Sequence, residues 1–257
     1  MDKANAAAVA GKRMIFFGLL LAGWQGLYSS GVWSPLIFPS PADTWSALSG
    51  GFGDGTIPAA VGASLRRVLI GYGMAVILGL SIGAAMARWR TVQQTLGSLV
   101  LGMQTLPSIC WLPLALLWFG LDEKAVILVV ILGSTFAVTE ASYSGFKQVP
   151  ALYRRAALTM GANQLQMLRR VLIPAALPSI ITGMKLSWSF AWRSLMAGEL
   201  LYSDVGLGQL LNRGRDLADM GGVVAIMVVI VAIGLLVNGA FFAPVERHVR
   251  RRWGVAV

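Results

Sequence analysis

The sequence predicts an all-α integral membrane protein, and its composition leads to this fold class. Of the 257 residues, 56% are apolar and only 12% are charged, whereas a soluble domain carries about 25% charged residues. The mean hydropathy is +0.71. A net charge of +10 could indicate nucleic-acid binding, but such proteins combine basic patches with a polar surface that this composition cannot supply. We therefore expect membrane lipid, and no nucleic acid, around this chain.

Six apolar segments are candidates to cross the hydrocarbon layer, for which a helix needs roughly 20 residues. They are residues 14–28, 68–87, 96–119, 125–145, 174–201 and 223–243. The first follows Lys12 and Arg13, as in a signal peptide, but Trp24, Gln25 and Tyr28 replace the small residues of a cleavage site. This favours an uncleaved anchor and six transmembrane helices in total.

Two of the six segments contain features that shape helix packing. Gly79 and Gly83, in the second segment, form a G-x-x-x-G pattern, which allows two helix backbones to approach closely. The third segment contains Pro107 and Pro113. Because proline removes a backbone donor and bends a helix, this segment should be kinked or broken.

The basic residues predict the orientation of the chain. With the N-terminus in the cytoplasm, six spans also place the C-terminus there, and the inner segments then hold 14 of the 21 lysines and arginines. The outer segments hold five of them, Arg66 and Arg67 included, and seven of the 11 acidic residues. Since an excess of Lys and Arg marks the cytoplasmic side, both termini are expected in the cytoplasm.

The outer and inner connections each predict a helix outside the spans. On the outside, Ser40 is a helix-cap residue followed by Pro41 at the first helical position and Asp43 at the third, which predicts a short surface helix. On the inside, residues 151–170 are compatible with a helix whose apolar residues recur at spacings of three to four. This inner helix suits either a resting place on anionic lipid head groups or the docking of a cytoplasmic partner.

Several motifs in the second half of the chain have a spacing that is known from one protein family. Arg155-Ala156-Ala157, then Gly161 and then Val171-Leu172-Ile173-Pro174 resemble in spacing the EAA signature of the permeases of bacterial ABC importers. Further matches are similar to the branch for nitrate, taurine, aliphatic sulfonates and bicarbonate. They are Phe38-Pro39-Ser40-Pro41, Trp111-Leu112-Pro113-Leu114, Leu117-Trp118-Phe119-Gly120, Pro174-Ala175-Ala176-Leu177-Pro178, Ala191-Trp192-Arg193, Gly198-Glu199-Leu200 and Gly206-Leu207-Gly208.

The resemblance implies a cytoplasmic coupling helix between the fourth and fifth spans, seated in a cleft of an ATPase subunit. The residues it assigns to this coupling are Arg155, Ala156, Ala157, Gly161, Ala162 and Pro174. Arg155 stands where the family has glutamate, so the role of that acid does not carry over. Gly161 matches the family's turn between the coupling helix and the next helix, which glycine makes at low cost.

The resemblance also implies one transmembrane domain over residues 1–257. Within it, 1–60 is an N-terminal span with an outer surface segment, 61–245 is the permease core, and 246–257 is a basic cytoplasmic tail. The tail carries the single histidine, His248, which we expect to be solvated.

Four charged residues lie within the spans, where a charge is costly and therefore indicates function. They are Glu140, Lys185, Arg193 and Glu199. On a helix, Lys185, Trp188, Trp192 and Glu199 fall within about 80° of one another. This stripe, with Arg193 beside it and Glu140 on the fourth span, is the predicted lining of a translocation path. The alternatives are that the tryptophans only pack, and that Glu140 only bonds at its helix end.

Lys185 and Arg193 on such a path would suit an anionic solute, which they could bind by charge-assisted hydrogen bonds. The alternative is that Arg193 pairs with Glu199 or Glu140 and only holds helices together. With a single cysteine, Cys110, and a single histidine, a Cys–His or Ser–His–Asp site is nearly excluded. A phosphate-binding loop of the pattern G-x-x-x-x-G-K-[ST] is also missing from the sequence.

The expected function is therefore that of a transport subunit rather than an enzyme, in the bacterial inner membrane. The resemblance implies a second permease chain, two ATP-binding subunits that hold the ATP and Mg²⁺, and an outer substrate-binding protein. No cofactor is expected in this chain. The alternative function is a stand-alone ion-coupled secondary transporter or channel, which would require inverted repeats. A membrane-bound enzyme is disfavoured by the lack of clustered catalytic side chains.

Overall fold

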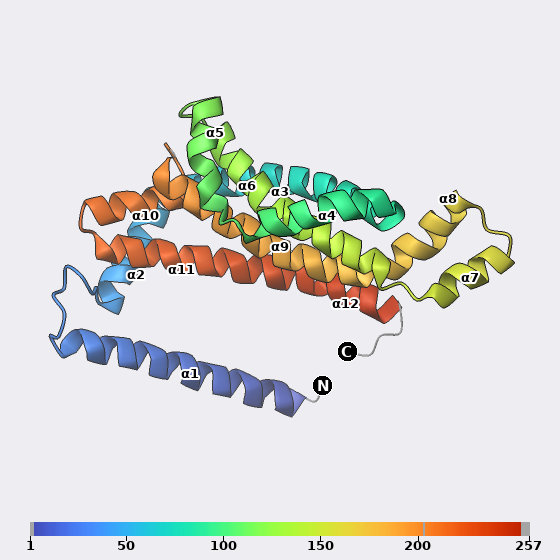
Figure 1. The fold of residues 1–257 in the computed structure, drawn as a ribbon. Coiled ribbons are helices and arrows are strands. Elements are labelled where there is room, and N and C mark those ends of the chain that lie inside the picture. The colour runs from blue at the N-terminus through green and yellow to red at the C-terminus, as the bar shows by residue number, and fades with distance from the viewer. Residues whose placement is uncertain (1–2, 203, 253–257) are drawn as a thin grey trace.

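The computed structural model describes residues 3–202 and 204–252, with the backbone alone at 3–10, 250 and 252. All regular structure in this part of the chain is helical (Figure 1). The long helices α3 (Thr56–Arg88), α6 (Glu123–Lys147), α9 (Ile173–Leu201) and α11 (Met220–Val237) form a bundle, and α1 (Lys3–Ser29) lies apart from it. The all-α prediction is confirmed for these residues.

Four helical stretches are long and apolar enough to cross a membrane. They are Thr56–Arg88, Glu123–Lys147, Gln164–Leu201 and Met220–Val249. A fifth is added if the bent pair Arg90–Thr105 and Ser108–Phe119 counts as one span. The predicted second, fourth, fifth and sixth spans therefore meet these criteria, whereas the described part of α1 does not.

The centre of the fold is the contact of α6 with α3 on one side and with α9 on the other. Gly79 and Gly83 of α3 face α6 so closely that a Cβ on Gly83 would lie 2.5 Å from the Thr139 carbonyl oxygen. A Cβ on Gly79 would lie 2.6 Å from that of Val138. The G-x-x-x-G prediction of close backbone approach is confirmed, and the partner is α6.

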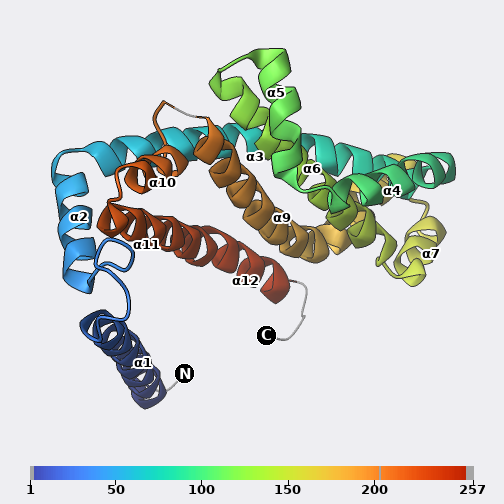
Figure 2. The ribbon, with the colours of Figure 1, turned by 60° about the vertical axis from the view of Figure 1, so that its left-hand side comes forward.

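The predicted third span is broken rather than gently kinked. Helix α4 (Arg90–Thr105) ends at Leu106, whose extended backbone precedes Pro107. A 3₁₀ turn, η1 (Ser108–Trp111), and α5 (Leu112–Phe119) follow at an angle of 100° to α4. Pro107 explains the break, because the residue before a proline is disfavoured in helical conformation. Figure 2 shows α5 leaving the bundle at this bend.

The predicted outer surface helix is present as α2 (Pro41–Gly53). Ser40 and Asp43 form a reciprocal capping box: the Asp43 amide donates to the Ser40 hydroxyl oxygen, and the Ser40 amide donates to the carboxylate. The hydroxyl of Ser40 donates to the same carboxylate at 2.7 Å, and these bonds hold the pKa of Asp43 below its usual range. The box is thus intact at neutral pH and opens as the pH falls through the lowered pKa.

Replacing Ser40 with alanine should destabilise the start of α2 by about 1 kcal/mol, the typical cost of losing an N-cap. Hydrogen exchange of the first amides of α2 should accelerate roughly fivefold in consequence. Ser49→Ala is the control, since the Ser49 hydroxyl only donates to the carbonyl of Ser46 within the same helix. Equal exchange rates in the two variants would show that the cap contributes nothing.

The chain after α9 returns along the bundle through α10 (Leu207–Asp216), α11, the π-helical turn η3 (Asn238–Phe242) and α12 (Ala243–Arg252). The wider turn of η3 carries Phe242, 3% exposed, into the core beside Trp188. His248 is exposed on α12, as expected. The start of α1 and the end of α12 point toward the end of the bundle from which α7 (Ala151–Thr159) projects (Figure 1).

Candidate functional site

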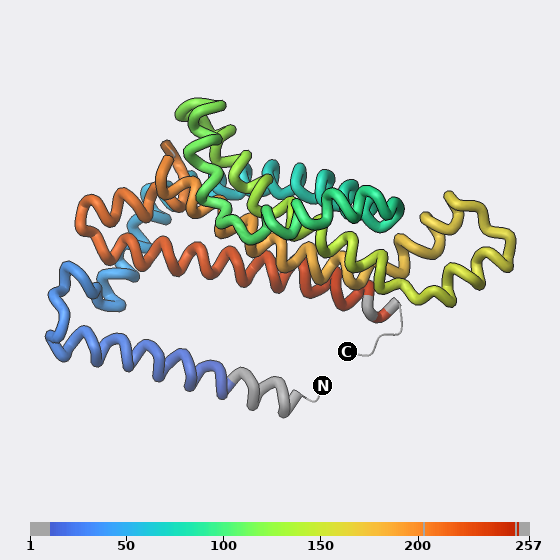
Figure 3. Tube along the Cα trace, viewed as in Figure 1, coloured from blue at the N-terminus to red at the C-terminus, as the bar shows by residue number. Residues whose placement is uncertain are grey.

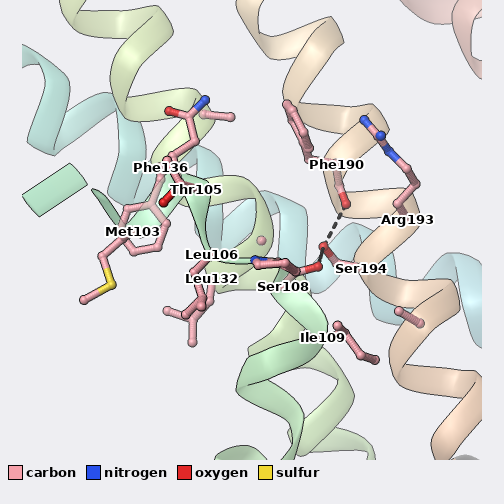
Figure 4. Close-up of a pocket in the computed structure, with 15 residues that line it drawn as sticks. Met103, Thr105, Leu106, Ser108, Ile109, Leu132, Phe136, Phe190, Arg193 and Ser194 are labelled. Carbon is pink, nitrogen blue, oxygen red and sulfur yellow. Dashed lines mark hydrogen bonds between the residues drawn. The ribbon is translucent and has the colours of Figure 1, made fainter. Parts of the chain in front are cut away.

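A pocket of about 300 Å³ lies at the break between α4 and η1, where α6 and α9 complete its wall (Figure 4). It is lined by residues 103–109 of the broken span, by Leu132, Gly133, Phe136 and Ala137 of α6, and by Phe190, Arg193, Ser194 and Ala197 of α9. The break therefore brings a non-helical stretch of backbone, two serines and an arginine to one place within the helical bundle.

Close packing of small residues holds the wall of this pocket together. The Ser194 hydroxyl oxygen lies 2.8 Å from both the Ser108 hydroxyl oxygen and the Phe190 carbonyl oxygen. A Cβ on Gly133 would lie 2.0 Å from the Ser194 oxygen, so only glycine fits there. η1, α6 and α9 thus meet at a contact that leaves no space for larger side chains.

Arg193 is the one charged residue in the lining of the pocket. Its Nε donates to the Ser189 carbonyl at 3.1 Å, and its guanidinium carbon lies 4.8 Å from the centre of the Phe190 ring. No ion pair joins Arg193 to Glu199 or Glu140 in the described part of the chain. The remaining guanidinium donors of this intramembrane cation are available to an anion that enters the pocket.

The other residues of the predicted stripe lie away from this pocket. Trp188 and Trp192 are buried, stack with ring centres 6.3 Å apart, and Trp188 meets Tyr72 of α3 edge-on at 5.2 Å. Lys185 is half-exposed and lies 3.7 Å from the Glu246 carboxylate of α12. Within this single chain, the two tryptophans therefore pack in the core between α9 and α3. The ion pair of Lys185 with Glu246 connects α9 to α12.

Glu140 lies on α6, two turns before the helix ends at Lys147. Its carboxylate accepts a hydrogen bond of 3.0 Å from the Ser144 hydroxyl, one turn along the same helix, and the residue is half-buried. The bond lies within α6 and does not involve the unpaired carbonyls at the end of the helix.

Glu199, 1% exposed, is the centre of a buried polar cluster at the end of α9. Its carboxylate accepts from Arg67 at 2.8 Å, from the Ser64 hydroxyl at 2.7 Å and from the Gly208 amide at 3.0 Å. The Ser64 hydroxyl oxygen in turn accepts from the Leu207 amide at 2.9 Å. The cluster therefore joins the start of α10 to α3 and α9 and compensates both buried charges.

The two glycines of the Gly206-Leu207-Gly208 motif make room for this cluster. A Cβ on Gly206 would lie 2.5 Å from a Glu199 carboxylate oxygen, and a Cβ on Gly208 would lie 2.5 Å from the Glu199 Cβ. Their lack of side chains lets the backbone amides at the start of α10 reach the carboxylate and serine oxygens.

Arg67 is the functional residue that the sequence interpretation missed. It was placed in an outer segment before a span beginning at Val68, but α3 begins at Thr56 and Arg67 is only 8% exposed inside it. The helical spacing of small residues offered a signal, because Ser64, Arg67, Gly71 and Ala75 recur every three to four positions. Extending that face back from Gly79 predicts a buried arginine.

The predicted coupling segment consists of two helical pieces rather than one continuous helix. Helix α7 ends at Thr159 because Gly161 adopts a left-handed conformation, with φ of +76°. The amides of Gly161 and Ala162 donate to the carbonyls of Leu158 and Ala157, which closes the helix end. Asn163 then caps α8 (Gln164–Gln166), which continues through the π-helical turn η2 (Met167–Leu172) into α9.

The residues predicted for coupling occupy different environments on this segment. Arg155 and Ala156 are exposed, Ala157 is 2% exposed on the face toward η2, and Gly161 is exposed at the turn. Ala162 is half-buried, and Pro174 stands at the start of α9, directly after the π-helical turn η2. The described residues contain no group of three His, Cys, Asp or Glu side chains that could hold a metal ion.

Comparison of the sequence with known proteins gives one family and close relatives within it. Residues 75–251 match the family described as the binding-protein-dependent transport system inner membrane component. The chain is 36% identical over 176 residues to the putative ABC transporter permease protein MJ0413 of Methanocaldococcus jannaschii, which covers 68% of this chain and 66% of that one. It is 31% identical over 225 residues to the taurine transport system permease protein TauC of Escherichia coli, 86% of this chain and 82% of that one.

A third relative and a solved structure extend this comparison. The putative aliphatic sulfonates transport permease protein SsuC of Bacillus subtilis is 28% identical over 236 residues, 92% of this chain and 85% of that one. Among solved structures, a chain of the inward-facing MetNI methionine ABC transporter has the same fold, with a TM-score of 0.66. That match covers 76% of this chain and 96% of that chain at 19% identity.

Proposed function

This chain belongs to the family of binding-protein-dependent transport system inner membrane components, as the permease subunit of an ABC importer, and we propose that it carries a small anionic solute past Arg193. The observation that carries the proposal is the pocket at the break of α4, which holds an arginine without an acidic partner in the described chain. Relatives named for taurine and aliphatic sulfonates support an anion.

Six spans with both termini in the cytoplasm complete the proposed topology. Helix α1 is the first span and the bent pair α4 with η1–α5 is the third. Support comes from the common direction of the start of α1 and the end of α12, and from the basic residues near both. The outer side then holds α2, α10 and the Glu199 cluster, and the cytoplasmic side holds α7. The membrane is the bacterial inner membrane.

The proposed mechanism assigns the chemistry to partner subunits and the change of access to this chain. Two ATP-binding subunits bind ATP and Mg²⁺, and their closure moves α7 in each of two permease chains, which form a homodimer. Because α7 joins α6 to α9, this movement shifts the pocket wall formed by Gly133, Arg193 and Ser194. A substrate-binding protein delivers the solute on the outer side.

Among the predicted path residues, Arg193 is the one that the proposal places against the solute. Lys185, through its ion pair with Glu246, holds the tail helix against α9. Trp188 and Trp192 are buried and support α9 from behind the face that carries Arg193. Glu140 bonds Ser144 within α6, and Glu199 holds the start of α10 against the end of α9. These residues lie on α6 and α9, which pack against each other.

The test of the proposed function is uptake of radiolabelled taurine into vesicles that contain the complete importer. Arg193→Gln removes the charge and leaves a shorter, neutral amide, and should raise the KM about tenfold or more, since charge-assisted bonds contribute about 1.5–3 kcal/mol. The KM of Arg193→Lys should lie between those of the wild type and Arg193→Gln. Arg215→Gln is the control, because Arg215 is exposed on α10 and pairs with its neighbour Asp216.

Two results would contradict the role of Arg193. One is uptake by Arg193→Gln with an unchanged KM for taurine. The other is an equal loss in Arg193→Gln and in the Arg215→Gln control, because a defect shared with an exposed outer residue does not come from the pocket. Uptake without ATP, by this chain alone, would instead contradict the assignment of ATP-driven import.

The turn at Gly161 gives a second test, directed at coupling. Gly161→Val forces a β-branched residue into the left-handed region, at a cost of about 1–3 kcal/mol. No heavy atom lies within 4 Å of the position of its Cβ, so the effect is one of backbone conformation alone. We expect taurine uptake and ATPase stimulation to fall severalfold or more. Gly161→Asn is the matched control, because asparagine tolerates this conformation; equal activity of both variants would exclude a role for the turn.

A further inference from the structure

The coupling segment, which consists of α7, the turn at Gly161, α8 and η2, projects beyond the end of the bundle (Figures 1 and 3). It carries exposed apolar side chains. The largest are those of Leu152, Leu158, Met160 and Leu165, which are 70%, 64%, 80% and 57% exposed. Exposed apolar residues are ordinary on a helix that faces lipid, but this segment projects past the helices that cross the membrane. Its apolar surface therefore needs an occupant other than the bundle.

Around these apolar residues the charge has one sign. Between Glu140 and Glu199 the sequence contains no acidic residue, while the coupling segment contains Arg154, Arg155, Arg169 and Arg170. All four arginines are exposed, and none makes an ion pair in the described part of the chain. The surface is thus apolar with cations that lack carboxylate partners.

The order of side chains around α7 distinguishes a protein cleft from a lipid surface. At 100° per residue, Arg155 lies about 60° from Leu152 on one side and about 60° from Leu158 on the other. A helix that rests on a membrane separates an apolar face from a charged face. Here the cation lies between the two leucines, which matches a cleft that has apolar walls and a carboxylate between them.

We propose that the cleft of the ATP-hydrolysing partner subunit that receives α7 presents an aspartate or glutamate to Arg155, between apolar walls that contact Leu152 and Leu158. This inference rests on the proposed function, which supplies such a partner on the cytoplasmic side. What the inference adds is the charge of the cleft. The coupling segment has four arginines and no acidic residue, so a complementary surface on the partner must be acidic.

The partner surface is first located by cross-linking from the native chain. A photoreactive benzoylphenylalanine at position 152, in the full-length protein in its own membrane, should form cross-links to an ATP-binding subunit. Mass spectrometry of the cross-linked peptide should show an aspartate or glutamate within a few residues of the linked position. Cross-links only to lipid, or to a peptide without an acidic residue nearby, would overturn the proposal.

The charge is then tested in the complex reconstituted in nanodiscs, by the affinity of the permease for that ATP-binding subunit. Arg155→Glu should weaken binding at least about tenfold, and Arg155→Gln should weaken it less, as expected for a close charge pair at an interface. The control is Arg90→Glu, which reverses another exposed arginine outside the coupling segment. Reversal of the cross-linked acid to arginine should restore binding of Arg155→Glu but not of the wild type.

Each failure points to a different claim. Wild-type binding by Arg155→Glu, or no rescue by the reversed partner, would overturn the acidic cleft while ATP-driven uptake continues and the proposed function stands. A loss for Arg155→Glu only in discs with anionic lipid, and not in neutral discs, would assign the segment to the membrane surface. No ATP-driven uptake by the wild-type complex would instead contradict the proposed function.

Discussion

Replacing Glu199 with alanine should prevent the protein from accumulating in the membrane in folded form. The variant leaves the guanidinium of Arg67 buried at 8% exposure and removes the carboxylate that lies 2.8 Å from it. It also removes the acceptor of the Ser64 hydroxyl and of the Gly208 amide. Removing one partner of a buried ion pair typically costs about 3–5 kcal/mol, a large fraction of the stability of a domain. Yield of monodisperse protein and thermal unfolding in detergent measure the effect.

Two comparisons separate the buried charge pair from a general effect of mutation. The double variant Arg67→Met with Glu199→Met should be more stable than Glu199→Ala, because it removes the buried guanidinium together with its closest carboxylate. The second carboxylate near Arg67, that of Glu123 at 3.6 Å, keeps its pair with Arg66. Arg66→Ala is the surface control, since Arg66 is 65% exposed in its pair with Glu123, and exposed pairs contribute about 0–1 kcal/mol. A Glu199→Ala protein as stable as Arg66→Ala would show that the cluster does not hold α10 in place.

The second large effect is expected from Gly83→Val, which should separate α3 from α6. A Cβ at this position would lie 2.5 Å from both the Thr139 carbonyl oxygen and the Ser142 Cβ. Neither contact can be relieved by rotation of a long side chain, so one of the two helices must move. Overpacking of this kind typically costs about 1–3 kcal/mol, and valine adds two further methyl groups to the clash. The temperature of thermal unfolding in detergent and the rate of taurine uptake should both fall.

Gly73→Val is the matched control for this substitution. Gly73 lies on the same helix, is exposed, and has no heavy atom within 4 Å of the position of its Cβ. The two variants therefore share the change in helix propensity and differ in the contact with α6. If Gly73→Val were as unstable as Gly83→Val, helix propensity rather than the α3–α6 contact would explain the loss.

The sequence predicted those features of the fold that depend on local chemistry. Hydropathy located four of the spans, Pro107 predicted the break, and Ser40 with Asp43 predicted the start of α2. Each depends on residues near one another in the chain. The inner helix was predicted over residues 151–170, whereas α7 ends at Thr159. Gly161 was identified as a turn, but the polar residues that follow it are compatible with a helix by pattern alone.

Contacts between distant parts of the chain could not be predicted in the same way. Arg67 and Glu199 are 132 residues apart, and nothing local to either shows that the other compensates its charge. The stripe of Lys185, Trp188 and Trp192 was correctly placed on one helix face, but periodicity does not state what that face meets. The structure supplies Tyr72, Phe242 and Glu246 as neighbours. Arg193, beside the stripe, faces the pocket instead.

The glycines between α3 and α6 also determine how the molecule can move. Since these backbones touch with no flexible side chains between them, the two helices cannot slide past each other without a clash, and they translate as one rigid body. Helix α6 has 25 residues and is therefore about 37 Å long. It acts as a stiff lever with α7 at one end. In the proposed topology, a displacement of α7 by the partner subunit would therefore be transmitted along α6 to the outer side of the membrane with little loss.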